Sequence, residues 1–221
     1  MNADWLQARE SRFCIDGPAG AIELLVNGVG DHPRAIALIC HPHPLHGGSM
    51  DNKVVFTLAR ACRDQDIIAV RFNFRGVGAS AGVHDNGVGE AVDAHFLFDE
   101  LRKQSRGLPV VLAGFSFGAA IVAQLTETVD AAALVLAAPP VTRYGMDRIS
   151  AVPVPVLLLQ GDDDAVVDSA HVYEWFSYLS SPKKVRHNWQ NGGHFFHGML
   201  PEIKSATEAF LSALVLPSVQ L

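Results

Sequence analysis

Short runs of hydrophobic residues recur along this chain, separated by longer segments in which hydrophobic positions lie three or four apart. The runs predict strands at residues 34–40, 67–74, 110–113, 132–138, 154–160 and 184–189. The spaced segments predict helices at 53–64, 89–103, 119–125, 169–179 and 195–214. Alternating strands and helices favour an α/β fold with a mainly parallel, twisted sheet that carries helices on both faces.

The start of the chain adds a hairpin to this pattern. Residues 12–14 and 21–26 flank the turn-forming segment 16–20, which predicts two further short strands and one antiparallel member of an about eight-stranded sheet. Polar loops follow several expected strands, and loops at the carboxyl ends of parallel strands meet at one edge. We find no linker, repeat or low-complexity tract, so residues 1–221 are expected to form a single domain.

Composition narrows the classes of partner. The chain is 49% hydrophobic and 18% charged, and its net charge of −6 argues against nucleic acid as a partner. Its hydrophobic runs fall short of the roughly 20 residues that span a membrane, and the first residues show no signal-peptide pattern. Cys14, Cys40 and Cys62 form no Cys-x-x-Cys pair, so we expect buried free thiols and a cytoplasmic location.

The hydrophobic run that starts at residue 110 leads into Gly114-Phe115-Ser116-Phe117-Gly118, and a helical segment follows. Strand, tight turn and helix are the context in which a Gly-x-Ser-x-Gly sequence presents a serine nucleophile. The two glycines let strand and helix approach closely, and the serine is expected to adopt a strained backbone conformation. The alternative is a glycine-rich turn whose serine has no chemical role.

A serine hydroxyl needs a base to become nucleophilic at neutral pH, and the base needs an orienting acid. Two polar loops offer these groups in the chain order serine, aspartate, histidine. Asp162, Asp163 and Asp164 follow the expected strand 154–160, and His194 follows the strand 184–189 after two glycines. The coincidence of three loops favours a catalytic serine over an inert one.

Two more segments make the pattern specific. They are His41-Pro42-His43-Pro44-Leu45-His46-Gly47-Gly48 and Phe72-Asn73-Phe74-Arg75-Gly76-Val77-Gly78-Ala79-Ser80. Together with the three loops above, they resemble the α/β-hydrolase superfamily, and within it a group of compact bacterial serine hydrolases. The resemblance extends from about residue 20 to the end, and it implies an α/β-hydrolase fold without a cap domain.

The resemblance also implies roles for individual residues. The catalytic residues would be Ser116, Asp164 and His194, because the family pattern Gly-x-x-Asp-x-Val-Val selects the third aspartate of the run. Asp162 is expected to bind turn amides, and Asp163 to be solvated.

An oxyanion hole requires two backbone amides that face the developing negative charge. The resemblance assigns one to Phe117 and the other to His43, with Leu45 as the alternative. Leu45, Tyr144 and Phe195 are expected to contact the substrate.

Two other residues have open roles. Arg75 is expected to anchor loops through charge-assisted hydrogen bonds, with a substrate carboxylate as its alternative partner. His197 is expected to pack, or to form a hydrogen bond, beneath its loop.

Only the segment 141–153 stands where larger superfamily members carry a lid, so the site is expected to be open and suited to small esters. The resulting hypothesis is a carboxylesterase-like serine hydrolase that forms an acyl-enzyme on Ser116. It would use no cofactor and no metal, act on a small-molecule ester and exist as a monomer or homodimer.

Three alternatives stay open. A thioesterase or a peptidase would use the same three residues, because the sequence does not separate leaving groups. A metal-dependent hydrolase would use a cluster of His41, His43 and His46. A non-catalytic binding module on the same scaffold is the third alternative.

Overall fold

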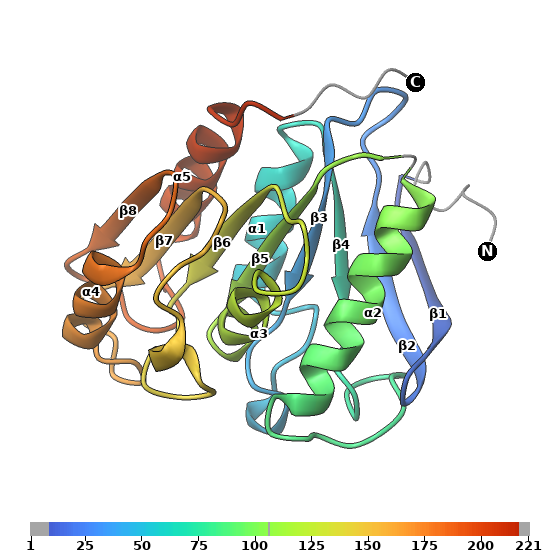
Figure 1. Cartoon of the computed structure of the whole chain (residues 1–221), viewed down its shortest axis with the longest axis horizontal. Coiled ribbons are helices and arrows are strands. Elements are labelled where there is room, and N and C mark those ends of the chain that lie inside the picture. The colour runs from blue at the N-terminus through green and yellow to red at the C-terminus, as the bar shows by residue number, and fades with distance from the viewer. Residues whose placement is uncertain (1–8, 106, 217–221) are drawn as a thin grey trace.

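The described part of the chain forms one sheet of eight strands in the order β1-β2-β4-β3-β5-β6-β7-β8 (Figure 1). The computed structural model describes residues 9–105 and 107–216, so the first residues, which bear on the expected lack of a signal peptide, lie outside it. The strands are β1 Ser11–Gly17, β2 Gly20–Asn27, β3 Ala35–Cys40, β4 Ile67–Phe72, β5 Val110–Phe115, β6 Ala133–Ala137, β7 Val156–Gly161 and β8 Lys184–Trp189. Among them, β2 alone runs opposite to its neighbours, as the hairpin pattern predicts.

Five helices cover the two faces of the sheet (Figure 1). They are α1 Lys53–Arg63, α2 Val88–Gln104, α3 Phe117–Leu125, α4 Ser169–Tyr178 and α5 Leu200–Ser212. Buried side chains of α2, α3 and α4 join one hydrophobic cluster, and those of α1 and α5 join another on the opposite face. In β3, Ile36 and Leu38 belong to the first cluster whereas Ala37 and Ile39 belong to the second. Because both faces are covered, the central strands read as continuous hydrophobic runs.

The last helix begins later than the sequence pattern indicates. It starts at Leu200, with Pro201 in its first turn, where the missing amide hydrogen has no helical partner to lose. Residues 194–199 form turns instead, and Phe196 lies in the left-handed region at φ 52° with its side chain fully buried. This turn lets the loop after β8 fold back over the sheet before the helix begins.

The cysteines do not all share one environment, so the expectation of three buried thiols is wrong for Cys14. It lies on the exposed side of β1, an edge strand whose exposure alternates along its length. Cys40 and Cys62 are buried, and burial raises the pKa of both thiols, that of Cys62 to about 12. All three are free.

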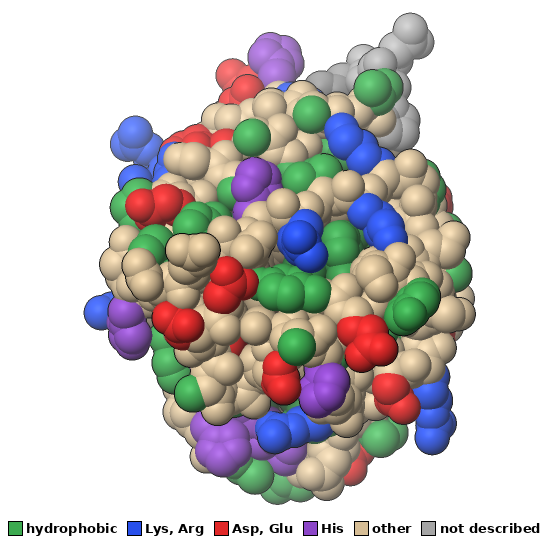
Figure 2. Space-filling model, turned by 90° about the vertical axis from the view of Figure 1, so that its left-hand side faces the viewer, with side chains coloured by type: hydrophobic (Ala, Val, Ile, Leu, Met, Phe, Trp, Pro, Cys, Tyr) green, Lys and Arg blue, Asp and Glu red, His purple; other side chains and the backbone are tan. Residues whose placement is uncertain are grey.

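The opposite edge of the sheet, β8, is mostly exposed. Lys184, Arg186 and His187 are exposed along it, and charged side chains on an edge strand oppose pairing with another sheet. On this side of the molecule acidic, basic and hydrophobic side chains are interspersed (Figure 2).

The connection between β6 and β7 contains no cap domain. Within this fully described segment, the regular structure is a single 3-10 turn, η3 Met146–Arg148. The carboxyl ends of the parallel strands lie at the lower edge of the sheet in Figure 1, and this connection places no cap domain over them. No helix in the described ranges combines the length and the apolar character needed to cross a bilayer.

Candidate active site

Ser116 lies at the tip of the turn between β5 and α3. Its backbone has φ 53° and ψ −119°, which confirms the strain expected of this position, and its amide donates to the Ala137 carbonyl of β6 at 2.8 Å. A Cβ at Gly114 would lie 2.3 Å from the Gly118 carbonyl oxygen, and one at Gly118 would lie 2.3 Å from the Cys40 carbonyl oxygen. Both glycines are therefore needed for the strand and the helix to meet at this angle.

His194 reaches this serine from the loop after β8. Its Nε2 lies 2.9 Å from Ser116 Oγ, and its Nδ1 lies 2.8 Å from Asp164 Oδ2. Each of the three residues is no more than 9% exposed. The loop passes close to β7, since a Cβ at Gly161 would lie 2.0 Å from the Gly192 carbonyl oxygen.

Asp164 is the aspartate of the run 162–164 that meets the histidine. Its Oδ1 accepts hydrogen bonds from the Val166 and Val167 amides, both at 2.8 Å. Burial alone would raise the pKa of this carboxyl, but hydrogen bonds from His194 and from these amides outweigh burial and lower the pKa. The side chain is therefore an anion at neutral pH.

The neighbouring aspartates have other surroundings. Asp162 accepts hydrogen bonds from the Tyr173 hydroxyl and from Asn188 Nδ2, so the expectation that it binds turn amides is wrong. It instead ties α4 to β8. Asp163 is exposed, as expected, and Asp168 caps α4 by accepting from the Ala170 amide at 2.9 Å.

His41 braces the loop that follows β3. Its Nε2 accepts from the Phe74 amide at 3.0 Å, and its Nδ1 lies 2.6 Å from the Pro42 carbonyl oxygen. A carbonyl only accepts and an amide N–H only donates, so the ring is the neutral tautomer with its proton on Nδ1. Burial, the largest influence, lowers the pKa of His41 to about 4.

The two residues expected to supply oxyanion-hole amides, Phe117 and His43, line the cavity at Ser116. Phe117 is the first residue of α3, so its amide has no partner within the helix. His43 packs on Phe117, with 5.1 Å between ring centroids, and both residues line the cavity at Ser116. The Leu45 amide donates to His43 Nδ1 at 3.2 Å, which occupies the alternative donor.

A cavity of about 450 Å³ opens at Ser116. Tyr144 and Phe195, two of the expected substrate contacts, lie in its wall. The third, Leu45, is 71% exposed and does not line the cavity. The complete lining is Pro42, His43, His46, Gly47, Gly48, Asn52, Ser116, Phe117, Pro140, Arg143, Tyr144, Val166, Val167, His194 and Phe195. The wall is mixed, with aromatic and aliphatic side chains beside several histidines and one arginine.

Two residues at or near this cavity, His84 and Arg143, belong to none of the sequence motifs. The ring of His84 lies 4.7 Å from that of His43 and 5.6 Å from that of Phe117, and its Nδ1 lies 2.8 Å from Glu90 Oε1. Arg143 stands on the short connection between β6 and β7. The only hint for Arg143 was its place in the segment where larger relatives carry a lid.

Arg75 anchors a loop rather than facing the cavity. Its Nε and Nη2 donate to the two carboxylate oxygens of Asp93, each at 2.8 Å, and this pair fastens the loop after β4 to α2. The anchoring expectation is confirmed, and the side chain is absent from the cavity lining.

His197 is exposed, so the expectation that it packs beneath its loop is wrong. Its ring lies 6.0 Å from that of Phe195.

The arrangement does not favour the metal-binding alternative. Both ring nitrogens of His41 are engaged by the backbone, which leaves only His43 and His46 of the three-histidine cluster. Within residues 9–105 and 107–216, no group of three or more histidine, cysteine, aspartate or glutamate side chains is arranged to hold a metal ion.

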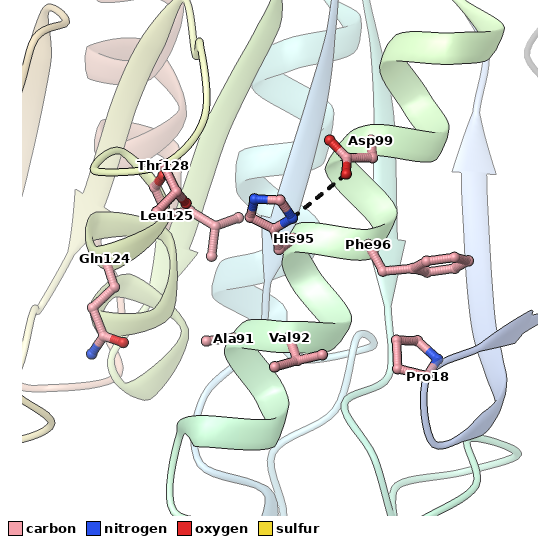
Figure 3. A pocket seen from close by; sticks show the side chains of 9 residues that line it. All are labelled: Pro18, Ala91, Val92, His95, Phe96, Asp99, Gln124, Leu125 and Thr128. Carbon is pink, nitrogen blue, oxygen red and sulfur yellow. Dashed lines mark hydrogen bonds and ion pairs between the residues drawn. The ribbon is translucent and has the colours of Figure 1, made fainter.

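A second concavity, of about 470 Å³, lies between α2 and α3 (Figure 3). Its polar side chains include His95 and Asp99 of α2, whose Nδ1 and Oδ2 are 3.6 Å apart. The pair is exposed, and no serine or cysteine stands in the described lining. This concavity therefore lacks the nucleophile that the cavity at Ser116 contains.

Comparisons with known proteins agree with the fold. Residues 31–146 match the model of the family described as serine aminopeptidase, S33. An uncharacterized protein of Rickettsia prowazekii (strain Madrid E) is 37% identical over 89% of this chain and 87% of its own.

Two solved structures are also similar. An alpha-beta serine hydrolase homologue from Coxiella burnetii has 40% identity and a TM-score of 0.85, and covers 90% of this chain and 96% of its own. XC6422 from Xanthomonas campestris is described as an a/b serine hydrolase without lid. It has 34% identity and a TM-score of 0.84, and covers 96% of this chain and 97% of its own. The chain therefore belongs to the α/β serine hydrolases, in the family described as serine aminopeptidase, S33.

Proposed function

We propose that this protein is a carboxylesterase-like serine hydrolase that cleaves small ester substrates through an acyl-enzyme on Ser116. The observation that carries the proposal is the hydrogen-bonded chain from Ser116 Oγ to His194 Nε2 at 2.9 Å and from His194 Nδ1 to Asp164 Oδ2 at 2.8 Å. Serine, base and acid in this geometry are the machinery of acyl transfer.

The proton positions follow from the acid. Because the pKa of Asp164 is lowered, its carboxylate is charged and accepts the Nδ1 proton of His194. The other ring nitrogen is then unprotonated and accepts the hydroxyl proton of Ser116 as the oxygen attacks the ester carbonyl. The imidazolium returns this proton to the leaving alcohol, and water then hydrolyses the acyl-enzyme by the same route in reverse.

The negative charge on the carbonyl oxygen needs donors that are already in place. The Phe117 amide serves as one, at the positive end of α3, and the His43 amide serves as the other. Burial lowers the pKa of His43, and neighbouring His84 and His46 lower it further, so its ring stays neutral beside the reacting carbonyl.

Ester substrates suit this cavity better than peptides with a free amino terminus. An aminopeptidase must hold the positively charged α-ammonium of its substrate, which calls for an acidic side chain. The described lining of the cavity contains no aspartate or glutamate, and Arg143 would repel the ammonium group. We therefore place ester hydrolysis ahead of aminopeptidase activity, with thioesters as substrates of the same machinery.

Labelling with a fluorophosphonate, mapped by mass spectrometry, tests the nucleophile. We expect a single adduct on Ser116 in the wild type, none in Ser116→Ala, and unchanged labelling in Ser150→Ala, a control at an exposed serine outside the cavity. Turnover of 4-nitrophenyl acetate should fall about a thousandfold or more in Ser116→Ala. An adduct elsewhere, or residual turnover near the wild-type rate, would refute the proposal.

The leaving group is tested with matched acetyl esters, thioesters and anilides. We expect the highest kcat/KM for the oxygen esters and activity that survives EDTA. A preference for anilides would indicate a peptidase. Wild-type protein inert toward all three substrates and toward the fluorophosphonate would instead support a binding module.

A further inference from the structure

The described lining of the cavity at Ser116 carries one permanently charged side chain, the cation Arg143, on a chain whose net charge is negative. The protein has a net charge of −6, yet the described lining of the cavity has no carboxylate, and it contains Arg143 beside the neutral ring of His43. The carboxylate of Asp164 lies outside this lining, where it is an anion that accepts hydrogen bonds from His194 and from the Val166 and Val167 amides. A negatively charged substrate would therefore meet a favourable local charge on a protein that is otherwise acidic.

Arg143 supplies the permanent charge of this cavity. It is exposed, and its guanidinium forms no hydrogen bond or ion pair with another residue in the ranges 9–105 and 107–216. This differs from Arg75, which is held by two hydrogen bonds to Asp93. The guanidinium of Arg143 is close enough to His43 and Tyr144 to act on both: burial, with a smaller contribution from Arg143, lowers the pKa of His43, whereas burial raises the pKa of Tyr144 and Arg143 opposes that rise.

The buried carboxylate that acts on both His43 and Tyr144, that of Glu90, does not pair with Arg143. Glu90 is fully buried, and its two carboxylate oxygens accept the Asp85 and Gly87 amides at 2.9 Å. One of these oxygens also lies 2.8 Å from His84 Nδ1. Its hydrogen-bonding capacity is thus committed to the start of α2, which leaves Arg143 available to a ligand.

The backbone that carries Arg143 is held in place. Its amide donates to the Pro140 carbonyl at 2.9 Å, and its carbonyl accepts the amide of Met146, a fully buried residue, at 3.1 Å. Next along the chain, the Tyr144 ring packs edge-on against Phe117 with 4.9 Å between centroids. The Tyr144 carbonyl accepts a hydrogen bond from Gln124 of α3. An anchored backbone with a free guanidinium is suited to binding a planar anion.

From these observations we propose that Arg143 is a specificity-determining residue, which binds a carboxylate on the substrate. The preferred substrates are then esters that carry a negative charge, such as half-esters of dicarboxylic acids. This inference rests on the proposed esterase function and names its substrate class. The carboxylate belongs either to the acyl part or to the leaving alcohol, and substrate pairs separate the two cases.

The test compares charged and neutral esters in each position. For the acyl side, mono-4-nitrophenyl glutarate is compared with 4-nitrophenyl butyrate. For the leaving group, 4-butyryloxybenzoate is compared with phenyl butyrate. The readout is the ratio of kcat/KM for the charged ester to that for the neutral ester. The pair in which the wild type favours the charged member identifies the position of the carboxylate.

Arg143→Gln should lower that ratio about tenfold, mainly through KM, since a hydrogen bond to a charged group contributes about 1.5 kcal/mol. Arg143→Lys should keep part of the preference for the charged ester, because lysine retains the positive charge but lacks the planar guanidinium group. Arg148→Gln is the matched control: it removes the same charge from an exposed position of the same loop, outside the cavity, and should leave the ratio unchanged. The wild-type preference should also shrink at high salt, where exposed charges are screened.

Two further results separate this inference from the proposed function. If the wild type hydrolyses neutral esters through Ser116 but Arg143→Gln and Arg148→Gln give equal ratios, the inference is overturned and the esterase function stands. If Ser116→Ala keeps its esterase activity, the proposed function fails. In that case, calorimetry compares glutarate binding to the Ser116→Ala protein and to the double variant Ser116→Ala/Arg143→Gln. Weaker binding to the double variant supports the inference. Equal binding to both proteins, or no binding to either, overturns it.

Discussion

The buried ring of His41 makes the stability of this protein depend on pH in a way that can be measured. The side chain is fully buried, accepts a hydrogen bond from the Phe74 amide at 3.0 Å and lies 2.6 Å from the Pro42 carbonyl oxygen. Protonating Nε2 would place an N–H against the Phe74 N–H and put a charge in the core. Burial therefore lowers the pKa of His41 from 6.5 to about 4, although the Pro42 carbonyl and Glu90 favour the charged form.

The direction of the effect follows from proton binding. Below pH 6.5 the unfolded chain binds a proton at His41, whereas the folded chain binds that proton only below about pH 4. The free energy of unfolding should therefore fall by about 1.4 kcal/mol for each pH unit across this window, and by about 3 kcal/mol in all. Above pH 6.5 and below pH 4, His41 adds no further pH dependence.

Urea denaturation at several pH values between 7.5 and 4 measures this contribution. His41→Gln keeps an acceptor for the Phe74 amide and removes the titrating ring, so its profile should lack the slope that the wild type shows. His32→Gln, at an exposed loop position, is the control and should follow the wild type. Parallel profiles for wild type and His41→Gln would refute the reasoning. The nitrogen chemical shifts of the His41 ring provide a second measurement. At pH 5 they should be those of a neutral ring that carries its proton on Nδ1.

Two further predictions concern the catalytic loops. Asp164→Asn would present an amide N–H to the histidine and favour the wrong tautomer, so kcat at pH 7 should fall about 10⁴-fold while the fold persists. A fall of less than tenfold, measured with 4-nitrophenyl acetate, would contradict this role. Gly161→Ala should lower the free energy of unfolding by about 3 kcal/mol, because its Cβ would lie 2.0 Å from a backbone oxygen. Gly193→Ala, whose Cβ would find its nearest neighbour at 3.9 Å, should stay within about 0.5 kcal/mol of wild type in the same urea titration.

Much of the fold could be predicted from the hydrophobic pattern alone. Strands buried on both faces leave continuous apolar runs, and for this reason β3 and β6 were located to within one residue at each end. The start of α5 was missed by five residues, because the apolar Phe195 and Phe196 read as a helical face while the chain actually forms turns there. The exposure of Cys14 was missed too, since it depends on which side of an edge strand meets the core.

Some features of the candidate site could likewise be predicted from the sequence, and others could not. The motif around Ser116, the order of the loops and the pattern that selects Asp164 are local, because a tight turn or a strand end needs particular residues in sequence. The contacts of His84 and the open guanidinium of Arg143 depend on how distant segments pack against Phe117 and Tyr144.

The sequence by itself thus determined the α/β architecture and which serine stands at the turn after β5, since backbone geometry and side-chain periodicity depend on short segments. Only the tertiary structure decided the chemistry around that serine. It brought His194 within 2.9 Å of Ser116 across the sheet and left Arg143 facing the cavity while Arg75 was neutralised by Asp93. Distances between residues far apart in the chain are set by the packing of whole elements, which no short segment encodes.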